Sequence, residues 1–537
     1  MSRAPLTLPV MLLLWSLLWL LGVSIRPPFP IDETRYLTVA WEMYQRNDWL
    51  LLHLNGAPYS HKPPLLFWLI NLGWGVFGVN GWWPRLVVWL CALLGLLGTH
   101  RLARRLWPAR PQIALTSTLL LGGCSYWLLF SHLLMFDLIL SAWVVLGLNA
   151  LLRTLHGERA GWLLLAIATA LGGLTKGPVI LLHLGLAALV MRLTLHEPAS
   201  PRQWLPKALA TIIVGLLPLL LWALLAAHRG GDAFAHELLF KQTGERMVSS
   251  FAHRRPFWWL LAMLPLLLLP WTLSLTAWRA AKGLPRLWSE PGLRFAALWS
   301  LAVLAAFSLI SGKQPHYLLP IFPALALLLA RAIDELPQSG APQREWLLAG
   351  MLLLFALSIM LITTGRLANP QLQALAPLAP LLPGWLAAAF ALLALLCLPG
   401  LDRHRSTLRN SLVIGGMTAL LYLGLLPAQL PRYRADDVSA LLHEAEQQQI
   451  PVAFIDFEYD GQFTFPALLR QPLAVVPAVQ AHGWAAQHPD GWLLFILDEA
   501  RAADSQPRPL LERRYRGSML YLYSAQALLE QGEFPSD

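Results

Sequence analysis

Charged residues are scarce in this chain of 537 residues, because only 13% are Asp, Glu, Lys or Arg, whereas 56% are hydrophobic. A soluble globular protein has about 25% charged residues, so the composition excludes an ordinary soluble fold over most of the length. Apolar runs of about 20 residues recur, which is the length a helix needs to cross a hydrocarbon core of about 30 Å. The sequence therefore predicts an all-α polytopic membrane protein.

Cysteine is rare as well. Cys91, Cys124 and Cys397 all lie inside apolar runs, where cysteine behaves as a small hydrophobic residue. Their positions predict no disulfide framework and say nothing about the redox compartment. The first apolar run, residues 8–25, lacks a small-x-small cleavage site, and many further runs follow it. We interpret it as an uncleaved first helix and not as a secretory signal.

Arg and Lys are distributed unevenly between the loops that connect about 13 expected spans. The spans are expected near residues 8–25, 86–101, 113–131, 138–153, 161–174, 178–193, 208–227, 257–276, 295–310, 317–332, 346–364, 382–398 and 411–428. One set of short loops is rich in basic residues, for example Arg104, Arg153 and Arg405. The positive-inside rule makes that side cytoplasmic. Because topology alone demands these residues, the net charge of +10 is no sign of nucleic-acid binding.

The opposite, outward side has two long loops, residues 26–85 and 228–256. Loops of that length are commonly functional. Residues 65–77 within the first loop are apolar but too short to span, which favours an interfacial helix. After about residue 430 the composition changes. A helical pattern over 436–449 and short apolar runs at 452–457, 492–497 and 519–523 predict a small outward α/β domain over 431–537, after a transmembrane domain over 1–430.

Asp32 and Glu33 follow the first span, where a helix is expected to begin and to run to Arg46. On that helix Asp32 shares a face with Arg35 and Tyr36. Two interpretations of Asp32 stay open at this stage. Asp is a favoured N-cap residue, and a carboxylate just outside a membrane is also a candidate catalytic group.

Asp137 and Lys176 lie at the outward ends of spans. An ionisable group at a span is costly and is a functional hypothesis by default, although an Asp at a helix end can simply pair with a basic residue. Lys176 occupies the turn Gly172-Gly173-Leu174-Thr175-Lys176-Gly177-Pro178. A Lys there can bind a phosphate as a point charge or can snorkel to the interface. The glycine spacing is not that of a Walker motif.

Further cations on the outward side run against the positive-inside bias. An outer cluster of positive charge suits an anionic substrate, and lipid phosphates are the obvious class at that depth. Its members are Lys62, Arg246, Arg254, Arg255 and Lys313. For His61, His253 and His316 ordinary hydrogen bonding competes with metal ligation, and no tight ligand spacing supports a metal.

Several of these segments together resemble a known family. The chain resembles the aminoarabinose lipid A transferase family and its protein O-mannosyltransferase relatives, within the C-type membrane glycosyltransferases. The segments that carry the resemblance keep their order over roughly the first 320 residues. They are Asp32-Glu33-Thr34-Arg35-Tyr36, Lys62-Pro63-Pro64 with Trp68, Asp137, Leu174-Thr175-Lys176-Gly177-Pro178, His253 with Pro256-Phe257-Trp258, and Lys313 with His316-Tyr317-Leu318-Leu319-Pro320.

The resemblance implies 13 spans, a periplasmic carboxyl-terminal domain in a bacterial inner membrane, and an active site under the first periplasmic loop. It implies transfer of aminoarabinose or a similar sugar, with inversion, from a polyprenyl-phosphate donor to lipid A or another envelope glycolipid. Asp32 and Asp137 fall at the family's two acidic catalytic positions. His61 departs from the family, which usually has Glu before the Lys-Pro pair, so the donor or the acceptor of this chain can differ.

The expected roles follow from this assignment. Lys62, Lys176, Arg246 and Lys313 are expected to neutralise the donor phosphate, and Asp32 to orient or deprotonate the acceptor. The substrate-binding candidates are Glu33, Arg35, Tyr36, His61, His253, His316 and Tyr317. No cofactor is required, and a divalent metal at His61 or His253 remains an alternative.

Two other functions stay open. The same donor type can serve a protein O-glycosyltransferase. A lipid-linked sugar transporter would also carry intramembrane charge, although we find neither inverted repeats nor paired broken helices.

Overall fold

The structure is a computed structural model that describes residues 8–195, 202–239, 254–337, 343–366, 373, 376–497 and 508–531. The chain forms two compact units. The first unit comprises Met1–Ile25, Ser60–Leu66 and Arg85–Leu425, and the second comprises Arg26–Tyr59, Phe67–Pro84 and Leu426–Asp537. The loop after the first span therefore belongs largely to the same unit as the carboxyl-terminal segment.

The first unit is helical. Its main helices are α1 (Leu8–Ile25), α4 (Trp82–Leu106), α5 (Gln112–Gly122), α6 (Ser125–Ser131), α7 (Phe136–Leu155), α8 (Ala160–Lys176), α9 (Val179–Thr194), α10 (Trp204–Val214), α11 (Leu217–His236), α13 (Trp259–Leu267), α14 (Leu275–Ala281), α15 (Pro291–Leu309), α16 (Phe322–Glu335), α17 (Trp346–Thr363), α19 (Trp385–Leu396) and α20 (Arg403–Leu420). Over the described ranges, eight helical stretches are long and apolar enough to cross a membrane, or nine if the pair α5 and α6, bent by 68°, counts as one span. Three more expected spans fall on the shorter apolar helices α8, α9 and α19.

One expected span, residues 257–276, is not a continuous helix. α13 ends at Leu267, a 3-10 turn follows at Trp271–Leu273, and α14 starts at Leu275. Pro270 explains the break, because proline has no N–H to donate and disfavours the α conformation of the residue before it. α14 then starts anew with Ser274 as its N-cap, whose side chain accepts a hydrogen bond from the Ala277 N–H over 3.2 Å.

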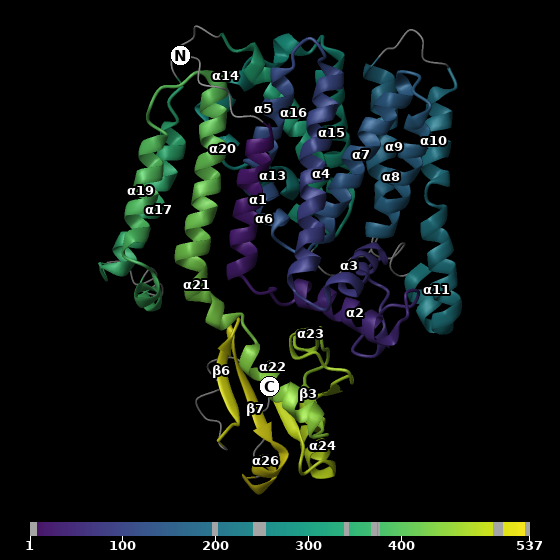
Figure 1. Cartoon of the computed structure of the whole chain (residues 1–537), viewed down its shortest axis with the longest axis vertical. Coiled ribbons are helices and arrows are strands. Elements are labelled where there is room, and N and C mark those ends of the chain that lie inside the picture. Colours follow the sequence, from purple (N-terminus) through teal and green to yellow (C-terminus); the bar gives the residue numbers. More distant parts are fainter. Residues whose placement is uncertain are drawn as a thin grey trace. The chain divides into compact units, whose positions relative to one another are not determined.

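Helix α7 lies at the centre of the first unit. Within this span 78% of the residues are buried, the largest share among the eight spans. A helix that is apolar all round belongs in an interior, and α7 packs against α8 and α9, which Figure 1 shows alongside it. At 20 residues it is about 30 Å long. Asp137 stands in its first turn and Arg153 in its last, at the two opposite ends.

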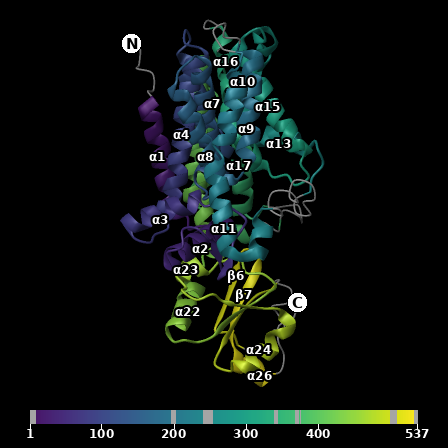
Figure 2. The same cartoon turned by 90° about the vertical axis from the view of Figure 1, so that its right-hand side faces the viewer.

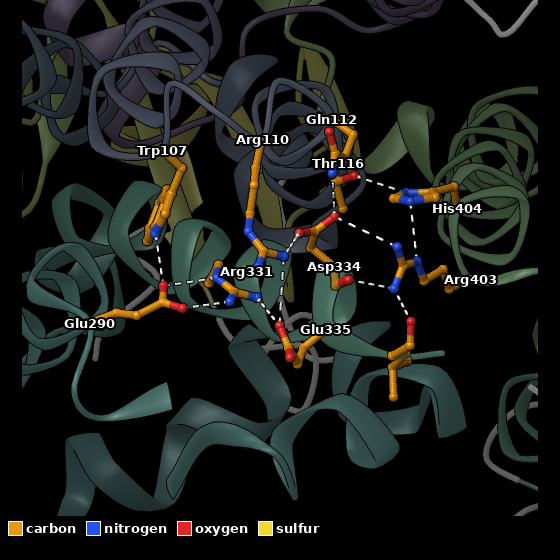
Figure 3. Close-up of polar contacts among 11 residues, drawn as sticks. Trp107, Arg110, Gln112, Thr116, Glu290, Arg331, Asp334, Glu335, Arg403 and His404 are labelled. Atoms are coloured by element: carbon orange, nitrogen blue, oxygen red, sulfur yellow. Dashed lines mark hydrogen bonds and ion pairs between the residues drawn. The ribbon is translucent and has the colours of Figure 1, made fainter. Parts of the chain in front are cut away.

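Buried ion pairs connect several helices at the Arg-rich end of the first unit (Figure 3). The Arg331 side chain, 2% exposed, reaches Glu290 of the α14–α15 connection and Glu335 one turn further along α16. Its Nε lies 2.9 Å from Glu290 Oε2, and its Nη1 lies 2.8 Å from Glu335 Oε2. The cation of α16 thus holds the start of α15.

Asp334 is the second centre of the same network. Its carboxylate is 1% exposed and accepts hydrogen bonds from Arg110 and from Gln112, each over 2.8 Å. Arg403 Nη2, at the start of α20, lies 3.7 Å from Asp334 Oδ1, the oxygen that also accepts from Gln112 (Figure 3). Asp334 therefore joins the α4–α5 loop, α16 and α20.

The second unit is an α/β structure, as predicted. Its elements are α2 (Asp32–Arg46), β1 (His53–Leu54), β2 (Ala57–Pro58), α3 (Leu65–Phe77), α22 (Asp436–Gln447), β3 (Val452–Ile455), α23 (Thr464–Ala467), β4 (Ala474–Val476), α24 (Ala481–Gln487), β5 (Trp492–Leu497), β6 (Leu511–Tyr515), β7 (Ser518–Ser524) and α26 (Ala525–Gln531). The sheet order is β4-β3-β5-β7-β6, with parallel pairing among β4, β3 and β5 and antiparallel pairing of β7 with both of its neighbours. Figure 2 shows β6 and β7 side by side, and α24 packs against α26.

Aromatic and carboxylate contacts fasten the first loop inside this unit. Trp74 of α3 stacks on Phe465 of α23, with ring centroids 5.4 Å apart and planes 1° apart. Glu42 of α2 accepts the backbone N–H groups of Asn55 and Gly56, at 2.5 and 3.0 Å. Burial raises the pKa of the Glu42 carboxyl, against the effect of these two hydrogen bonds. Residues 26–59 and 67–84 therefore fold together with the carboxyl-terminal segment.

The buried network around Asp334 should contribute measurably to the free energy of unfolding. Asp334→Asn leaves Arg403, 9% exposed, without its counter-charge. We expect a loss of about 3 kcal/mol in the free energy of unfolding, near the lower limit for breaking a buried pair, because the Arg110 side chain is 44% exposed. The measurement is the melting temperature of the protein in detergent.

The matched control is Glu335→Gln, since that carboxylate is 49% exposed and exposed pairs contribute about 0–1 kcal/mol. Its melting temperature should fall less than that of Asp334→Asn. Equal melting of the Asp334→Asn variant and the wild type would contradict a stabilising role for the network.

Candidate functional site

Asp137 is surrounded by cationic groups from separate segments of the first unit. Its side chain is 4% exposed, and it forms an ion pair with Lys176 from the last residue of α8. His316 Nε2 lies 3.8 Å from the second carboxylate oxygen. A buried carboxylate needs such partners, because an unpaired buried charge is strongly destabilising. The contact is also what a structural helix-end pair would show, so it fixes the geometry of Asp137 and not its role.

Lys176 is placed by the turn that follows it. Gly177 has a φ of 72°, which favours glycine, and Pro178 precedes the start of α9, so α8 ends at Lys176. The side chain is 17% exposed, and its Nζ lies 4.6 Å from the centroid of the Tyr317 ring. Contact with a ring face favours a cation. The ammonium is thus held between a carboxylate and an aromatic face.

Lys62 approaches the same region from the short segment Ser60–Leu66. Its Nζ lies 5.6 Å from the ring of Phe136, the residue that precedes Asp137. Three basic groups, Lys62, Lys176 and His316, therefore gather around one buried acid. Two lysines outweigh one carboxylate, so the net charge of the cluster is positive even with a neutral His316, which suits an anionic ligand such as a phosphate.

Lys313 is held differently. Its side chain is 3% exposed, and its Nζ donates to the carbonyl oxygens of Arg255, over 2.9 Å, and of Ile310. Arg254 pairs with Gly312 in an antiparallel bridge, so the two loop segments are fastened together. Burial lowers the pKa of the Lys313 ammonium. The described contacts of Lys313 hold a loop, and its expected role at a phosphate stays a prediction.

Glu237 lies beside the short segment Ser60–Leu66. Nothing in the sequence was a reason to select this acidic residue. Its Oε1 accepts the Ser60 hydroxyl over 2.8 Å and lies 3.9 Å from His61 Nε2. Both the His61 and Glu237 side chains are well exposed, at 44% and 39%. Among the residues that the structure describes, no group of three or more His, Cys, Asp or Glu forms a potential metal site. The other candidate residues in this loop region, Arg246 and His253, lie outside the described residues.

In the second unit, Asp32 is not the N-cap of α2. Ile31 takes that position, with its carbonyl accepting the Arg35 N–H over 2.9 Å, and no side chain caps the helix. Asp32 stands in the first turn, where the helix dipole favours a negative charge. Its side chain is 54% exposed, and its Oδ1 lies 3.6 Å from Arg35 Nη1. The capping interpretation is therefore wrong, and an accessible carboxylate remains.

The neighbours of Asp32 are buried supports. Glu33 is 3% exposed, pairs with Arg26 and accepts the Phe29 N–H over 2.7 Å. This bonding fixes the chain that leads into α2. Tyr36 is 4% exposed and packs edge-on against Phe67, with ring centroids 6.5 Å apart. The expectation that Glu33 and Tyr36 bind substrate stays a prediction, and the described contacts give both a packing role.

Comparisons with known proteins identify the family and the fold of this chain. Residues 61–222 match the family model described as dolichyl-phosphate-mannose-protein mannosyltransferase. A relative in Pseudomonas paraeruginosa, named undecaprenyl phosphate-alpha-4-amino-4-deoxy-L-arabinose arabinosyl transferase, is 34% identical over 61% of this chain and 60% of its own length. The chain thus spans about three fifths of that relative in the match. A second relative of the same name, in Pseudomonas fluorescens, is 30% identical over 82% of this chain and 79% of its own length.

A solved structure shares the fold. ArnT from Cupriavidus metallidurans, crystallised with undecaprenyl phosphate, superposes with a TM-score of 0.73 at 21% identity and covers 96% of this chain and 97% of its own. This likeness confirms the predicted C-type membrane glycosyltransferase fold and a multi-pass membrane protein. Given the long match to the Pseudomonas fluorescens relative, the chain belongs to the family of the undecaprenyl phosphate-aminoarabinose arabinosyl transferases.

Proposed function

We propose that this protein is a membrane glycosyltransferase that moves aminoarabinose, or a similar sugar, from undecaprenyl phosphate or another polyprenyl phosphate to lipid A or another envelope glycolipid. Family membership supports the reaction class and the donor, because the relatives carry that name. The observation that carries the proposal is the group of Lys62, Lys176 and His316 around Asp137. Such a group suits a lipid phosphate.

The proposed reaction is a single displacement. An acceptor oxygen forms a bond to the anomeric carbon while the bond from that carbon to the phosphate oxygen breaks. The bonding electrons leave with the lipid phosphate, and one displacement inverts the carbon. Lys62 and Lys176 stabilise the charge that develops on the leaving phosphate, and preplaced charges of this kind are often the largest catalytic contribution.

The acidic residues take separate roles in this proposal. Asp32 accepts the proton of an acceptor hydroxyl or, if the acceptor is already an ionised phosphate, positions the sugar. A positioned base contributes about 10²–10⁴-fold to the rate. Asp137 holds the Lys176 ammonium in place through their ion pair. No metal is needed for these steps, and chelation should leave the rate unchanged.

We place the reaction on the periplasmic face of a bacterial inner membrane. Asp137 and Arg153 lie at opposite ends of α7. The Arg153 end also carries Arg105, and both pair with Glu158. Short loops rich in Arg lie on the cytoplasmic side, which supports an outward position for the Asp137 end.

A protein hydroxyl is the second candidate acceptor, since residues 61–222 match a protein mannosyltransferase model. Mass spectrometry of lipid A and of envelope proteins from a deletion strain separates the two. Loss of a sugar from lipid A supports the first acceptor, and loss of a sugar from a protein supports the second. A purified transporter, by contrast, would not cleave the bond between the sugar and the lipid phosphate, and would transfer sugar to neither acceptor.

Replacing either acidic residue should stop transfer. Asp32→Asn and Asp137→Asn are each expected to lower the transfer rate of the purified protein by at least about 10²-fold. Asp32→Asn removes the general base, and Asp137→Asn removes the carboxylate that holds the Lys176 ammonium in place. The assay follows sugar release from undecaprenyl-phosphate sugar without any ion gradient. Asp436→Asn is the matched control, because Asp436 is an exposed carboxylate at the first residue of α22 as Asp32 is at the first residue of α2. Full activity of Asp32→Asn would refute the assignment.

Donor affinity should depend on Lys176. Lys176→Met is expected to weaken equilibrium binding of undecaprenyl phosphate by about tenfold or more, because a charge-assisted contact is lost, while Lys176→Arg retains part of the affinity. Lys282→Met, at an exposed residue near the Arg-rich end, controls for nonspecific loss of charge. Unchanged donor binding by Lys176→Met would remove the lysine from the proposed phosphate site.

A further inference from the structure

One face of α2 is bonded along its length to the carboxyl-terminal segment, inside the second unit. The Thr38 hydroxyl donates to the Gly461 carbonyl over 2.7 Å, and the Trp41 indole donates to the Leu469 carbonyl over 2.8 Å. Gln45 reaches the same Leu469 carbonyl over 3.3 Å. Residues at these spacings share one face of a helix. The helix that begins at Asp32 is therefore fixed by residues more than 400 positions away.

The approach is close enough to demand glycine. Gly461 has a φ of 75°, and a Cβ built on it would lie 2.8 Å from Leu54 Cδ1 and 3.0 Å from Thr38 Cγ2. The positive φ disfavours any residue but glycine there, and a Cβ would also crowd the Leu54 and Thr38 side chains. The loop between β3 and α23 is thus held against α2 at one definite point. That point comes directly after Asp460.

Arg35 bridges this loop to Asp32. Its Nη2 is paired with Asp460, and its Nη1 lies 3.6 Å from Asp32 Oδ1. The Arg35 side chain is 22% exposed, and Asp460 is 35% exposed. The planar guanidinium presents its donors in a fixed fork, so holding one arm sets the direction of the other. Asp460 consequently determines where the positive charge beside Asp32 stands.

We propose that Asp460 is a positioning residue for Asp32, acting through Arg35, and that the carboxyl-terminal segment thereby completes the catalytic helix. This inference rests on the proposed role of Asp32. Without Asp460, the guanidinium is free to turn fully onto Asp32 and to form a closer pair. The Asp32 carboxylate would then be engaged by Arg35 in place of the acceptor. Loss of Asp460 should therefore slow the chemical step and leave donor binding unchanged.

The test is a kinetic comparison of purified full-length variants with undecaprenyl-phosphate sugar as donor. Asp460→Asn is expected to lower kcat by about tenfold with the donor KM within twofold of the wild type. Asp460→Glu should recover at least half of the wild-type kcat. Asp437→Asn is the matched control: it breaks the Arg513–Asp437 ion pair of the same unit and should leave kcat unchanged.

A double-mutant cycle separates positioning from a general structural effect. Coupled residues show non-additive effects, so adding Asp460→Asn to Arg35→Met should lower kcat no further than Arg35→Met alone. Arg35→Lys keeps the positive charge but loses the forked guanidinium, so it should lower kcat as much as Asp460→Asn does. It replaces Asp460→Asn in the test if that variant gives too little folded protein.

Additive losses, or a wild-type kcat for Asp460→Asn, would overturn the inference while an inactive Asp32→Asn still supports the proposed function. An active Asp32→Asn would overturn both, since Asp460 would then have no catalytic carboxylate to position.

Discussion

The ion pair between Asp137 and Lys176 is the interaction on which the candidate site depends. Both groups lie at helix ends in the first unit, where a poorly exposed charge without a partner would destabilise the fold. Their contact fixes the end of α8 against the start of α7, the most buried span. It also leaves Lys176 against the Tyr317 ring and His316 beside the acid. The central helix α7 therefore carries the acid, and neighbouring segments bring the basic groups to it.

The second unit follows a different principle. Its catalytic candidate, Asp32, is exposed, and its environment is set by supports behind it. Glu33 and Arg26 fix the chain before the helix, while Asp460 fixes the neighbouring guanidinium. Residues 26–59 and 426–537 belong to one compact unit, so the carboxyl-terminal segment is part of the support of α2. The segment around α23, between β3 and β4, supplies the groups that hold α2.

The helical part of the fold was largely predictable, because the length of an apolar run determines where a helix can cross a membrane. The break in the helix around Pro270 was not predicted, because the span at residues 257–276 was placed by its apolar length alone and the effect of one proline was not considered. The strand Leu511–Tyr515 was missed because its pattern, Leu-Glu-Arg-Arg-Tyr, is mostly charged. Asp137 and Lys176 stood out as charges in apolar runs. Asp460 and Glu237 gave no such signal, because their partners lie 425 and 177 residues away in sequence. The capping role considered for Asp32 failed for a local reason, since Ile31 takes that position.

The central claim is that the cations around Asp137 receive a lipid phosphate. An experimental structure of the protein with undecaprenyl phosphate tests it most directly. We expect a phosphate oxygen at about 3 Å, hydrogen-bond distance, from Lys176 Nζ. A phosphate bound instead at the other end of α7, among the arginines near Glu158, would show that the cations around Asp137 are not its site.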